Sequence, residues 1–187
     1  MQKRTAFKLC LAGATAVALN AAPVAVFAKD EPLKVAFVYV SPANEEGWSS
    51  QHDIARKFVE EKFGDKIKVT WIENIPENAD AQRVIRDLAQ QGNKIIFATS
   101  FGYMNSVMKV AKQFPNVYFE HAPGYKTSKN VKNYTARFYE DRYLAGMLAA
   151  ATTKTNILGY VAALPIPEVF QGISAYTLGA RAVSPNI

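Results

Sequence analysis

Cysteine and histidine are scarce in this sequence. Its one cysteine is Cys10, near the start of the chain, and its two histidines, His52 and His121, lie far apart. The absence of any later cysteine excludes a disulfide framework and a thiolate metal site from the rest of the chain. We therefore predict that the protein holds no metal and no cofactor.

The sequence also lacks the glycine-rich motifs of nucleotide-binding enzymes. The segment Ser41–Gly47, which follows the first apolar run, has one glycine, and Glu45 and Glu46 would repel a pyrophosphate at the next helix. There is no P-loop and no Gly-x-Ser-x-Gly turn. A carboxylate pair for sugar hydrolysis is one interpretation of Glu45 and Glu46, but adjacent acids at a helix start more often face solvent. We find no catalytic constellation and predict that the chain is not an enzyme.

The first 28 residues have the pattern of a secretory signal peptide. Three basic residues, Lys3, Arg4 and Lys8, precede an apolar run over 9–19, and small residues end at Ala28. This pattern predicts export and cleavage after Ala28, which would place the mature protein in the periplasm.

Two other interpretations of this segment are weaker. A transmembrane anchor needs a longer apolar core than this one, which Asn20 and Pro23 interrupt. Acylation of Cys10 needs small apolar residues just before the cysteine, where Lys8 lies instead. We expect a soluble exported protein without a lipid.

Half of the net positive charge belongs to the predicted signal peptide. The whole sequence has 22 basic and 16 acidic residues, a net charge of +6. Without the three basic residues of 1–28, 19 basic residues face the same 16 acidic ones, a balance of +3. The two signs are interspersed along predicted helices, which indicates a solvated surface, so we predict no nucleic-acid partner.

Apolar runs of strand length alternate with helical patterns along the rest of the chain. This order predicts the α/β class, with a doubly wound parallel sheet covered by helices on both faces. The expected strands are Lys34–Val40, Val69–Ile72, Lys94–Thr99, Val117–Glu120, Tyr134–Phe138 and Ile157–Ala162. The expected helices are Trp48–Phe63, a segment between an Asn78 cap and Gly92, Met104–Phe114, Glu140–Thr153 and Glu168–Ala182.

The first expected helix has apolar residues on one side and charges on the other, as in a helix that covers a sheet with its apolar side. Its apolar side consists of Ile54, Phe58, Val59 and Phe63. We also expect His52 and Asp53 to form a local hydrogen-bonding pair.

Parallel sheets bind ligands at the carboxyl ends of their strands, where the winding direction reverses. The loops there are 41–47, 73–78, 99–103, 121–130 and 163–167. Trp48 and Phe101 offer flat faces that suit stacking on a planar ring. Polar groups able to bond the edges of such a ring are Ser41, Asn44, Ser100 and His121. Packing staples are the alternative interpretation of both aromatics, and Tyr103 is better explained by packing or by a place at the rim of the site.

Several motifs, in this order, resemble the basic membrane protein family of ABC transporter receptors, also called purine nucleoside receptor A-like. They are Gly47-Trp48 with His52-Asp53, Thr99-Ser100-Phe101-Gly102-Tyr103-Met104, and the stretch Phe138–Ala149 with Tyr143-Leu144-Ala145-Gly146. The resemblance implies a periplasmic binding protein-like type I fold. It also implies binding of a purine base or nucleoside in a cleft between two lobes, and delivery to an ABC permease in the inner membrane.

The resemblance also implies roles for single residues. In this family an aromatic after the first-loop glycine stacks on the purine, which matches Trp48, and an aromatic after the third strand lines the site, which matches Phe101. Many members carry a base-binding aspartate near the end of the fourth strand, where this chain has His121, a substitute by position only. Tyr143–Gly146 matches the crossover helix, a packing motif.

The family continues well beyond residue 187. We expect residues 29–153 to form an N-terminal α/β lobe and 154–187 to begin an incomplete second lobe, as in a fragment or truncated product. The missing part would supply ribose contacts and the opposing wall of the cleft. Alternatives are a receptor for a sugar or another small solute on the same fold and, less well supported, an exported α/β enzyme.

Overall fold

The computed structural model describes residues 31–187, so the predicted signal peptide lies outside the described residues. Five parallel strands form one sheet in the order β2-β1-β3-β4-β5, which confirms the α/β class. The strands are β1 (Leu33–Val38), β2 (Ile67–Ile72), β3 (Ile95–Ala98), β4 (Tyr118–His121) and β5 (Val131–Asn133). The helices are α1 (Trp48–Phe63), α2 (Ala79–Gln90), α3 (Met104–Gln113), α4 (Phe138–Thr152) and α5 (Pro167–Val183).

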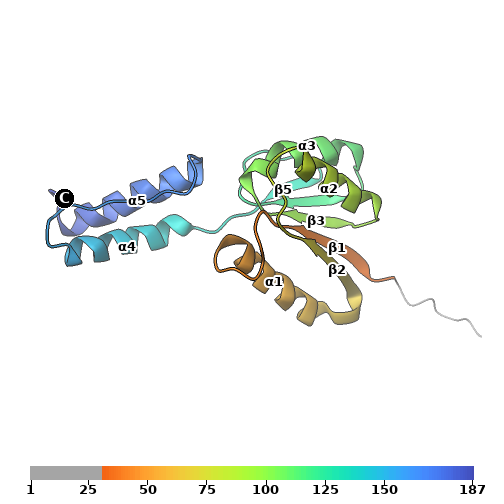
Figure 1. Cartoon of the computed structure of the whole chain (residues 1–187), viewed down its shortest axis with the longest axis horizontal. Coiled ribbons are helices and arrows are strands. Elements are labelled where there is room, and N and C mark those ends of the chain that lie inside the picture. The colour runs from red at the N-terminus through yellow and green to blue at the C-terminus, as the bar shows by residue number, and fades with distance from the viewer. Residues whose placement is uncertain (1–30) are drawn as a thin grey trace, which may run out of the picture. The chain divides into compact units, whose positions relative to one another are not determined.

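Helices lie on both faces of the sheet, with α1 on one face and α2 and α3 on the other (Figure 1). The alternation of side chains along β1 divides the core accordingly. Ala36 and Val38 pack with the apolar faces of α2 and α3, whereas Val35 and Phe37 belong to the core on the opposite face. Both faces of the central strands are therefore apolar, as the continuous apolar run predicted.

Helix α2 follows the local signals in the sequence closely. The Asn78 side chain accepts a hydrogen bond from the Asp80 amide at 2.8 Å, as expected of an N-cap. Gly92 follows the end of the helix with φ of 86°, a left-handed conformation that favours glycine. The predicted cap and stop are both confirmed.

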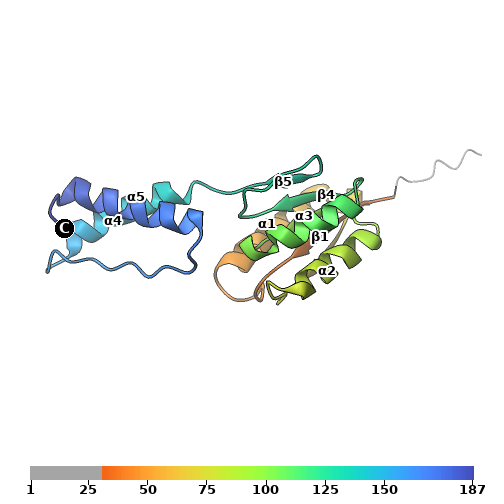
Figure 2. The ribbon, with the colours of Figure 1, turned by 90° about the horizontal axis from the view of Figure 1, so that it is seen from above.

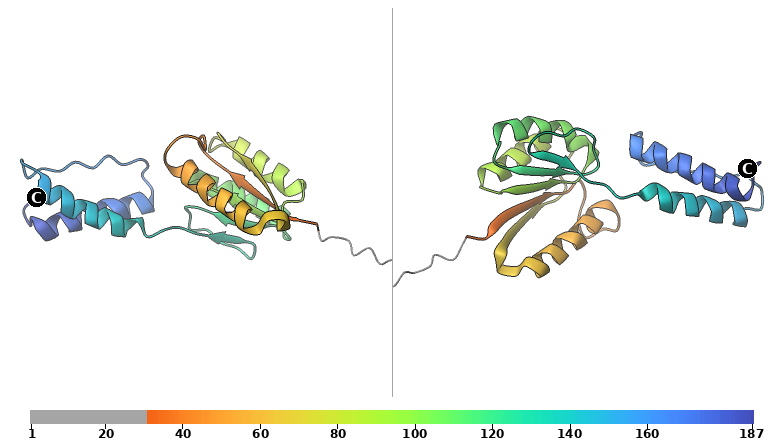
Figure 3. Two further views of the ribbon diagram at one scale, coloured as in Figure 1. Left: turned by 90° about the horizontal axis from the view of Figure 1, so that it is seen from below. Right: turned by 180° about the vertical axis from the view of Figure 1, so that it is seen from behind.

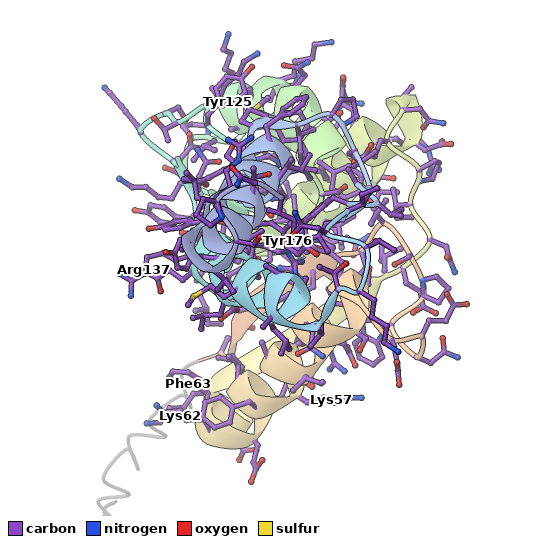
Figure 4. All side chains as sticks on the ribbon, turned by 90° about the vertical axis from the view of Figure 1, so that its left-hand side faces the viewer. Lys57, Lys62, Phe63, Tyr125, Arg137 and Tyr176 are labelled. Carbon is purple, nitrogen blue, oxygen red and sulfur yellow. The ribbon has the colours of Figure 1, made fainter. Side chains whose placement is uncertain are left out.

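Helix α1 has the predicted bounds but the opposite orientation. Ile54 and Phe58 are 57% and 61% exposed, while Asp53 and Arg56 face the sheet and are 4% and 3% exposed. Figure 4 shows Lys57, Lys62 and Phe63 on the outer surface of α1. The prediction that the apolar side packs inward is wrong.

The buried charges on α1 have partners on α1 itself, on β2 and at Tyr39, the residue after β1. Arg56 Nε donates to Asp53 Oδ1 at 2.6 Å, and the Tyr39 hydroxyl donates to the same oxygen at 3.5 Å. The Arg56 guanidinium lies 4.0 Å from the centre of the Trp71 ring, and it also pairs with Glu60. These partners satisfy the buried ion pair, so α1 can turn its charges toward the sheet.

Two predicted strands differ from the structure. The expected strand Tyr134–Phe138 is replaced by β5, which ends at Asn133, and Phe138 already begins α4. The expected strand Ile157–Ala162 is not a strand, because no neighbouring strand within residues 31–187 pairs with it. An apolar run becomes a strand only where a partner accepts its backbone hydrogen bonds.

Helices α4 and α5 lie side by side (Figures 2 and 3) and pack along each other. Glycines permit the close approach. A methyl group at Gly146 would overlap the carbonyl oxygen of Tyr176, and one at Gly179 would overlap that of Tyr143. Gly146 therefore has the packing role that the resemblance implied for this motif, whereas the side chains of Tyr143, Leu144 and Ala145 are exposed.

Candidate ligand-binding site

The loops after β1 and β3 are neighbours at the carboxyl edge of the sheet. Strands β1 and β3 pair directly, in the register Val38↔Ala98. The strand order runs from β1 to β2 on one side and from β3 to β4 on the other, so the winding reverses between these two strands. The two loops that carry the predicted aromatic residues therefore meet at the reversal point.

Trp48 is the first residue of α1 and is tied to the end of β3. Its Nε1 donates to the carbonyl oxygen of Thr99 at 2.7 Å. The preceding residue, Gly47, has φ of 121° and ψ of −145°, which a residue with a side chain rarely adopts. Glycine at position 47 thus lets the chain turn into α1 with the indole over the neighbouring strand.

Two cavities have Trp48 in their walls. One of about 260 Å³ brings together Trp48, Ser100 and Phe101, with Val40, Pro123 and residues from 163–169. The other, of about 460 Å³, is lined on one side by Trp48, His52 and Ala55 and on the other by Tyr134 and Phe138. The ring of His52 lies 4.8 Å from that of Trp48, so the indole is packed on one side and still lines open space.

His52 and Asp53 do not form the predicted pair. His52 Nδ1 lies 2.9 Å from the Trp48 carbonyl oxygen, and Asp53 bonds Arg56 and Tyr39 instead. Burial lowers the pKa of His52, and the contact with the Trp48 carbonyl opposes that shift only in part. His52 therefore supports the Trp48 turn as a neutral ring.

The polar residues of the first loop have different surroundings. The Ser41 hydroxyl lies 2.8 Å from the hydroxyl of Ser49, and the Ser41 amide donates to the same oxygen at 3.2 Å, so Ser41 braces the first turn of α1. Asn44 is exposed, as are Glu45 and Glu46. Of the two polar candidates in this loop, Asn44 is the accessible one.

The loop after β3 holds Phe101 between fixed neighbours. Ser100 is buried and its hydroxyl donates to Glu77. Phe101 is half-buried, with its ring 6.3 Å from that of Tyr125. Tyr103 is fully buried and donates to the Ile75 carbonyl oxygen, which confirms its packing role.

His121 is 1% exposed, and both ring nitrogens lie against acceptors. Nε2 is 2.8 Å from the Ser100 carbonyl oxygen, and Nδ1 is 3.2 Å from Asn133 Oδ1. The Asn133 amide donates to the Lys126 carbonyl oxygen, which fixes its oxygen toward the imidazole. Burial lowers the pKa of His121, against both of these contacts. No ring nitrogen is left for a ligand. At the position where the resemblance implied a substitute for the family's aspartate, His121 therefore bonds the protein's own Ser100 and Asn133.

Sequence reasoning missed the acidic residues of the loop 73–78. Glu73 accepts the Ala43 amide, and Glu77 accepts the Ser100 hydroxyl and the Gly102 amide. The sequence places this loop at the carboxyl edge of the sheet, because it follows β2. The position of a glutamate within a loop does not indicate which groups its carboxylate will bond.

Within residues 31–187, no group of three or more His, Cys, Asp or Glu side chains could hold a metal ion. No helix in the same part of the chain is long and apolar enough to cross a membrane.

A family model described as "ABC transporter substrate-binding protein PnrA-like" matches residues 33–187. The chain belongs to this family. The PnrA-like family consists of solute-binding receptors of ABC transporters, which are typically extracytoplasmic and are not enzymes.

Two relatives of this PnrA-like chain are named for different ligands. A purine-binding protein of Brucella abortus is 53% identical over 157 residues, which cover 84% of this chain and 45% of the relative. A putative ABC transporter glucose-binding protein of Haloferax volcanii is 43% identical over 83% of this chain and 39% of its own. The chain thus spans less than half the length of either relative.

Solved structures agree on the fold. An ABC transporter solute-binding protein of Aeropyrum pernix matches with a TM-score of 0.71 at 19% identity, over 82% of this chain and 44% of its own. A 5-methylthioribose-binding transporter protein of Thermotoga lettingae matches with a TM-score of 0.64 at 11% identity, over 83% and 48% of the two chains. The PnrA-like chain therefore has the periplasmic binding protein-like fold that the resemblance implied.

Proposed function

We propose that this chain belongs to a periplasmic receptor that binds a purine base or nucleoside and delivers it to an ABC permease in the inner membrane. The observation that carries the proposal is the fixed indole of Trp48, which lines a cavity together with Phe101. Stacking of an aromatic side chain on a base is worth about 1–3 kcal/mol. The name of the relative from Brucella abortus supports the same class of ligand.

We assign the contacts by accessibility. Trp48 and Phe101 stack on the purine ring, and Asn44, the exposed polar residue of the first loop, bonds its edge. Ser41, Ser100 and His121 are engaged inside the protein, so their role is to shape the loops.

We further propose a signal peptide over 1–28 and a boundary between two lobes at 134–137, earlier than residue 153. β5 is the last strand of the sheet, and α4 packs along α5. Helix α4 would then belong with α5 to the second lobe.

Calorimetric titration tests the ligand class. The protein, expressed at the full length of its gene, is titrated with adenine, adenosine and glucose. We expect binding of at least one purine and none of glucose. Purine affinity absent at millimolar concentration, in a folded protein, would overturn the proposal.

A sugar receptor is the second candidate. It is favoured by the relative from Haloferax volcanii, and sugars also stack on aromatic side chains. Glucose binding without purine binding would establish this candidate in place of the first.

A further inference from the structure

One carboxylate oxygen accepts two hydrogen bonds from the loop that carries Phe101. Oε1 of Glu77 accepts the Gly102 amide at 2.8 Å and also accepts the Ser100 hydroxyl. A side chain at position 102 would overlap the Glu77 carboxylate, so glycine is what lets the carboxylate approach this backbone. Both residues that flank Phe101 are thereby bound to the same atom of the preceding loop.

A second carboxylate of the same loop, that of Glu73, bonds the loop after β1. Oε2 of Glu73 accepts the Ala43 amide at 2.8 Å, within the loop that leads to Trp48. Between the two glutamates, the Ile75 carbonyl oxygen accepts the Tyr103 hydroxyl, and the Ile75 amide donates to the Tyr39 carbonyl oxygen at 3.1 Å. The loop after β2 is thus bonded to both neighbouring loops at several points.

The geometry of these bonds argues for a positioning role. β2 lies at the edge of the sheet, and Glu73 and Glu77 are absent from the walls of both cavities that Trp48 lines. Their carboxylates are instead directed at backbone amides and one hydroxyl, and hydrogen bonds to a charged acceptor are stronger than neutral ones. A shift of either aromatic loop would have to break such a bond.

We infer that the loop 73–78 is a clamp that positions the two proposed stacking residues, with Glu77 holding Phe101 and Glu73 holding the approach to Trp48. This inference rests on the proposed purine site. It makes the two glutamates positioning residues, which set the distance between the aromatic faces without contacting the ligand.

The first test needs no ligand. Glu77→Leu removes both bonds, whereas Glu77→Gln keeps one side-chain oxygen able to accept them. We expect at least about tenfold faster hydrogen exchange at the Gly102 amide in Glu77→Leu, the scale of one lost charge-assisted bond, and recovery in Glu77→Gln.

The chain has two tryptophans, so its indole N–H region shows two assignable signals in nuclear magnetic resonance spectra. We expect the chemical shift of the Trp48 indole signal to change in Glu73→Leu and in Glu77→Leu. It should be unchanged in the control Glu61→Leu, which removes an exposed carboxylate of α1.

The second test measures ligand affinity by calorimetry. We expect Glu77→Leu to weaken purine binding by about tenfold or more, with Glu77→Gln within about threefold of the wild type. Gly102→Ala displaces the carboxylate by a different route. We expect Gly102→Ala to weaken purine binding as Glu77→Leu does, because the added methyl group would overlap the Glu77 side chain and displace it from the Ser100 hydroxyl and the Gly102 amide. This second route also covers the case in which Glu77→Leu does not fold.

The two proposals fail in different ways. A wild type that binds no purine overturns the proposed function. The clamp is then tested without ligand, by hydrogen exchange at the Gly102 amide and by the Trp48 indole signal. Unchanged Gly102 exchange and an unchanged Trp48 signal in folded Glu77→Leu overturn the clamp. So does wild-type purine affinity in that variant or in folded Gly102→Ala.

Discussion

The indole nitrogen of Trp48 donates to the carbonyl oxygen of Thr99 at 2.7 Å, which joins the first residue of α1 to the end of β3. The two residues are 51 positions apart in the chain. This bond fixes the plane of the indole before any ligand arrives, so little ordering of that side chain remains to be done on binding.

Substitutions at Trp48 can separate the ring face from the indole bond. Trp48→Phe keeps an aromatic face and loses the bond to Thr99, while Trp48→Ala loses both. We expect Trp48→Ala to weaken purine binding by about tenfold or more, because a stacked base contributes about 1–3 kcal/mol, and Trp48→Phe to lie between it and the wild type. Calorimetry with adenine and adenosine measures this. Unchanged affinity in folded Trp48→Ala would show that the residue is only a packing staple.

Removal of Arg56 should destabilise the protein strongly. Arg56→Met leaves the buried Asp53 carboxylate without its main partner, and breaking such a pair costs about 3–5 kcal/mol. Burial alone raises the pKa of Asp53, but hydrogen bonds from Arg56 and Lys57 outweigh it and hold the pKa below its usual value. Urea unfolding gives the free energy.

Two matched variants sharpen this prediction. Asp53→Leu combined with Arg56→Met removes both buried charges and should recover much of the loss, since the charges left without these partners, Lys57 and Glu60, reach solvent. Arg83 pairs with Asp80 at 3.3 Å on the surface, with 63% and 53% of the two side chains exposed. Arg83→Ala should cost at most about 1 kcal/mol. Equal losses at Arg56 and Arg83 would contradict the buried network.

Methyl groups at the α4–α5 contact should be harmful. Gly146→Ala and Gly179→Ala each place a methyl group into the backbone of the other helix, and overpacking of this kind costs about 1–3 kcal/mol or more. Alanine otherwise favours a helix by about 1 kcal/mol over glycine. Gly172→Ala is the control on α5, because a methyl group there makes ordinary contacts 3.4 and 3.5 Å away. Thermal unfolding should order the variants with Gly172→Ala as the most stable.

Stability should fall as the pH drops below about 7. His52 and His121 are the only histidines, and burial lowers the pKa of both in the folded protein. Below the ordinary value of about 6.5, the unfolded chain takes up protons that the folded chain does not, so acid favours unfolding through this window. Urea midpoints at pH 7, 6 and 5 measure the decline.

The histidine contribution can be isolated by difference. His52→Gln combined with His121→Gln should flatten the profile between about pH 7 and 5. Burial raises the pKa of Glu120, which acts in the opposite sense at lower pH, so the comparison is made in a Glu120→Gln background as well. A decline of the same size with and without the histidines would contradict the assignment.

The sequence by itself determined the first four strands, the five helices, the bounds of α1, the Asn78 cap and the left-handed Gly92. These features depend on side chains within a few residues of one another, so their physical cause is local. The glycine–aromatic step at Gly47 and Trp48 was also readable, because only a residue without a side chain readily adopts that backbone conformation.

Only the tertiary structure decided which face of α1 is buried, where His121 directs its nitrogens, and that residues 157–162 are not a strand. Arg56 lies against the sheet because Trp71 of β2 and Tyr39, the residue after β1, complete its surroundings. His121 is occupied because Ser100 and Asn133 approach it from either side. Residues 157–162 have no strand beside them within residues 31–187. In each case the deciding partner is remote in the chain, so hydrophobic periodicity, which records each residue's own polarity, carries no information about it.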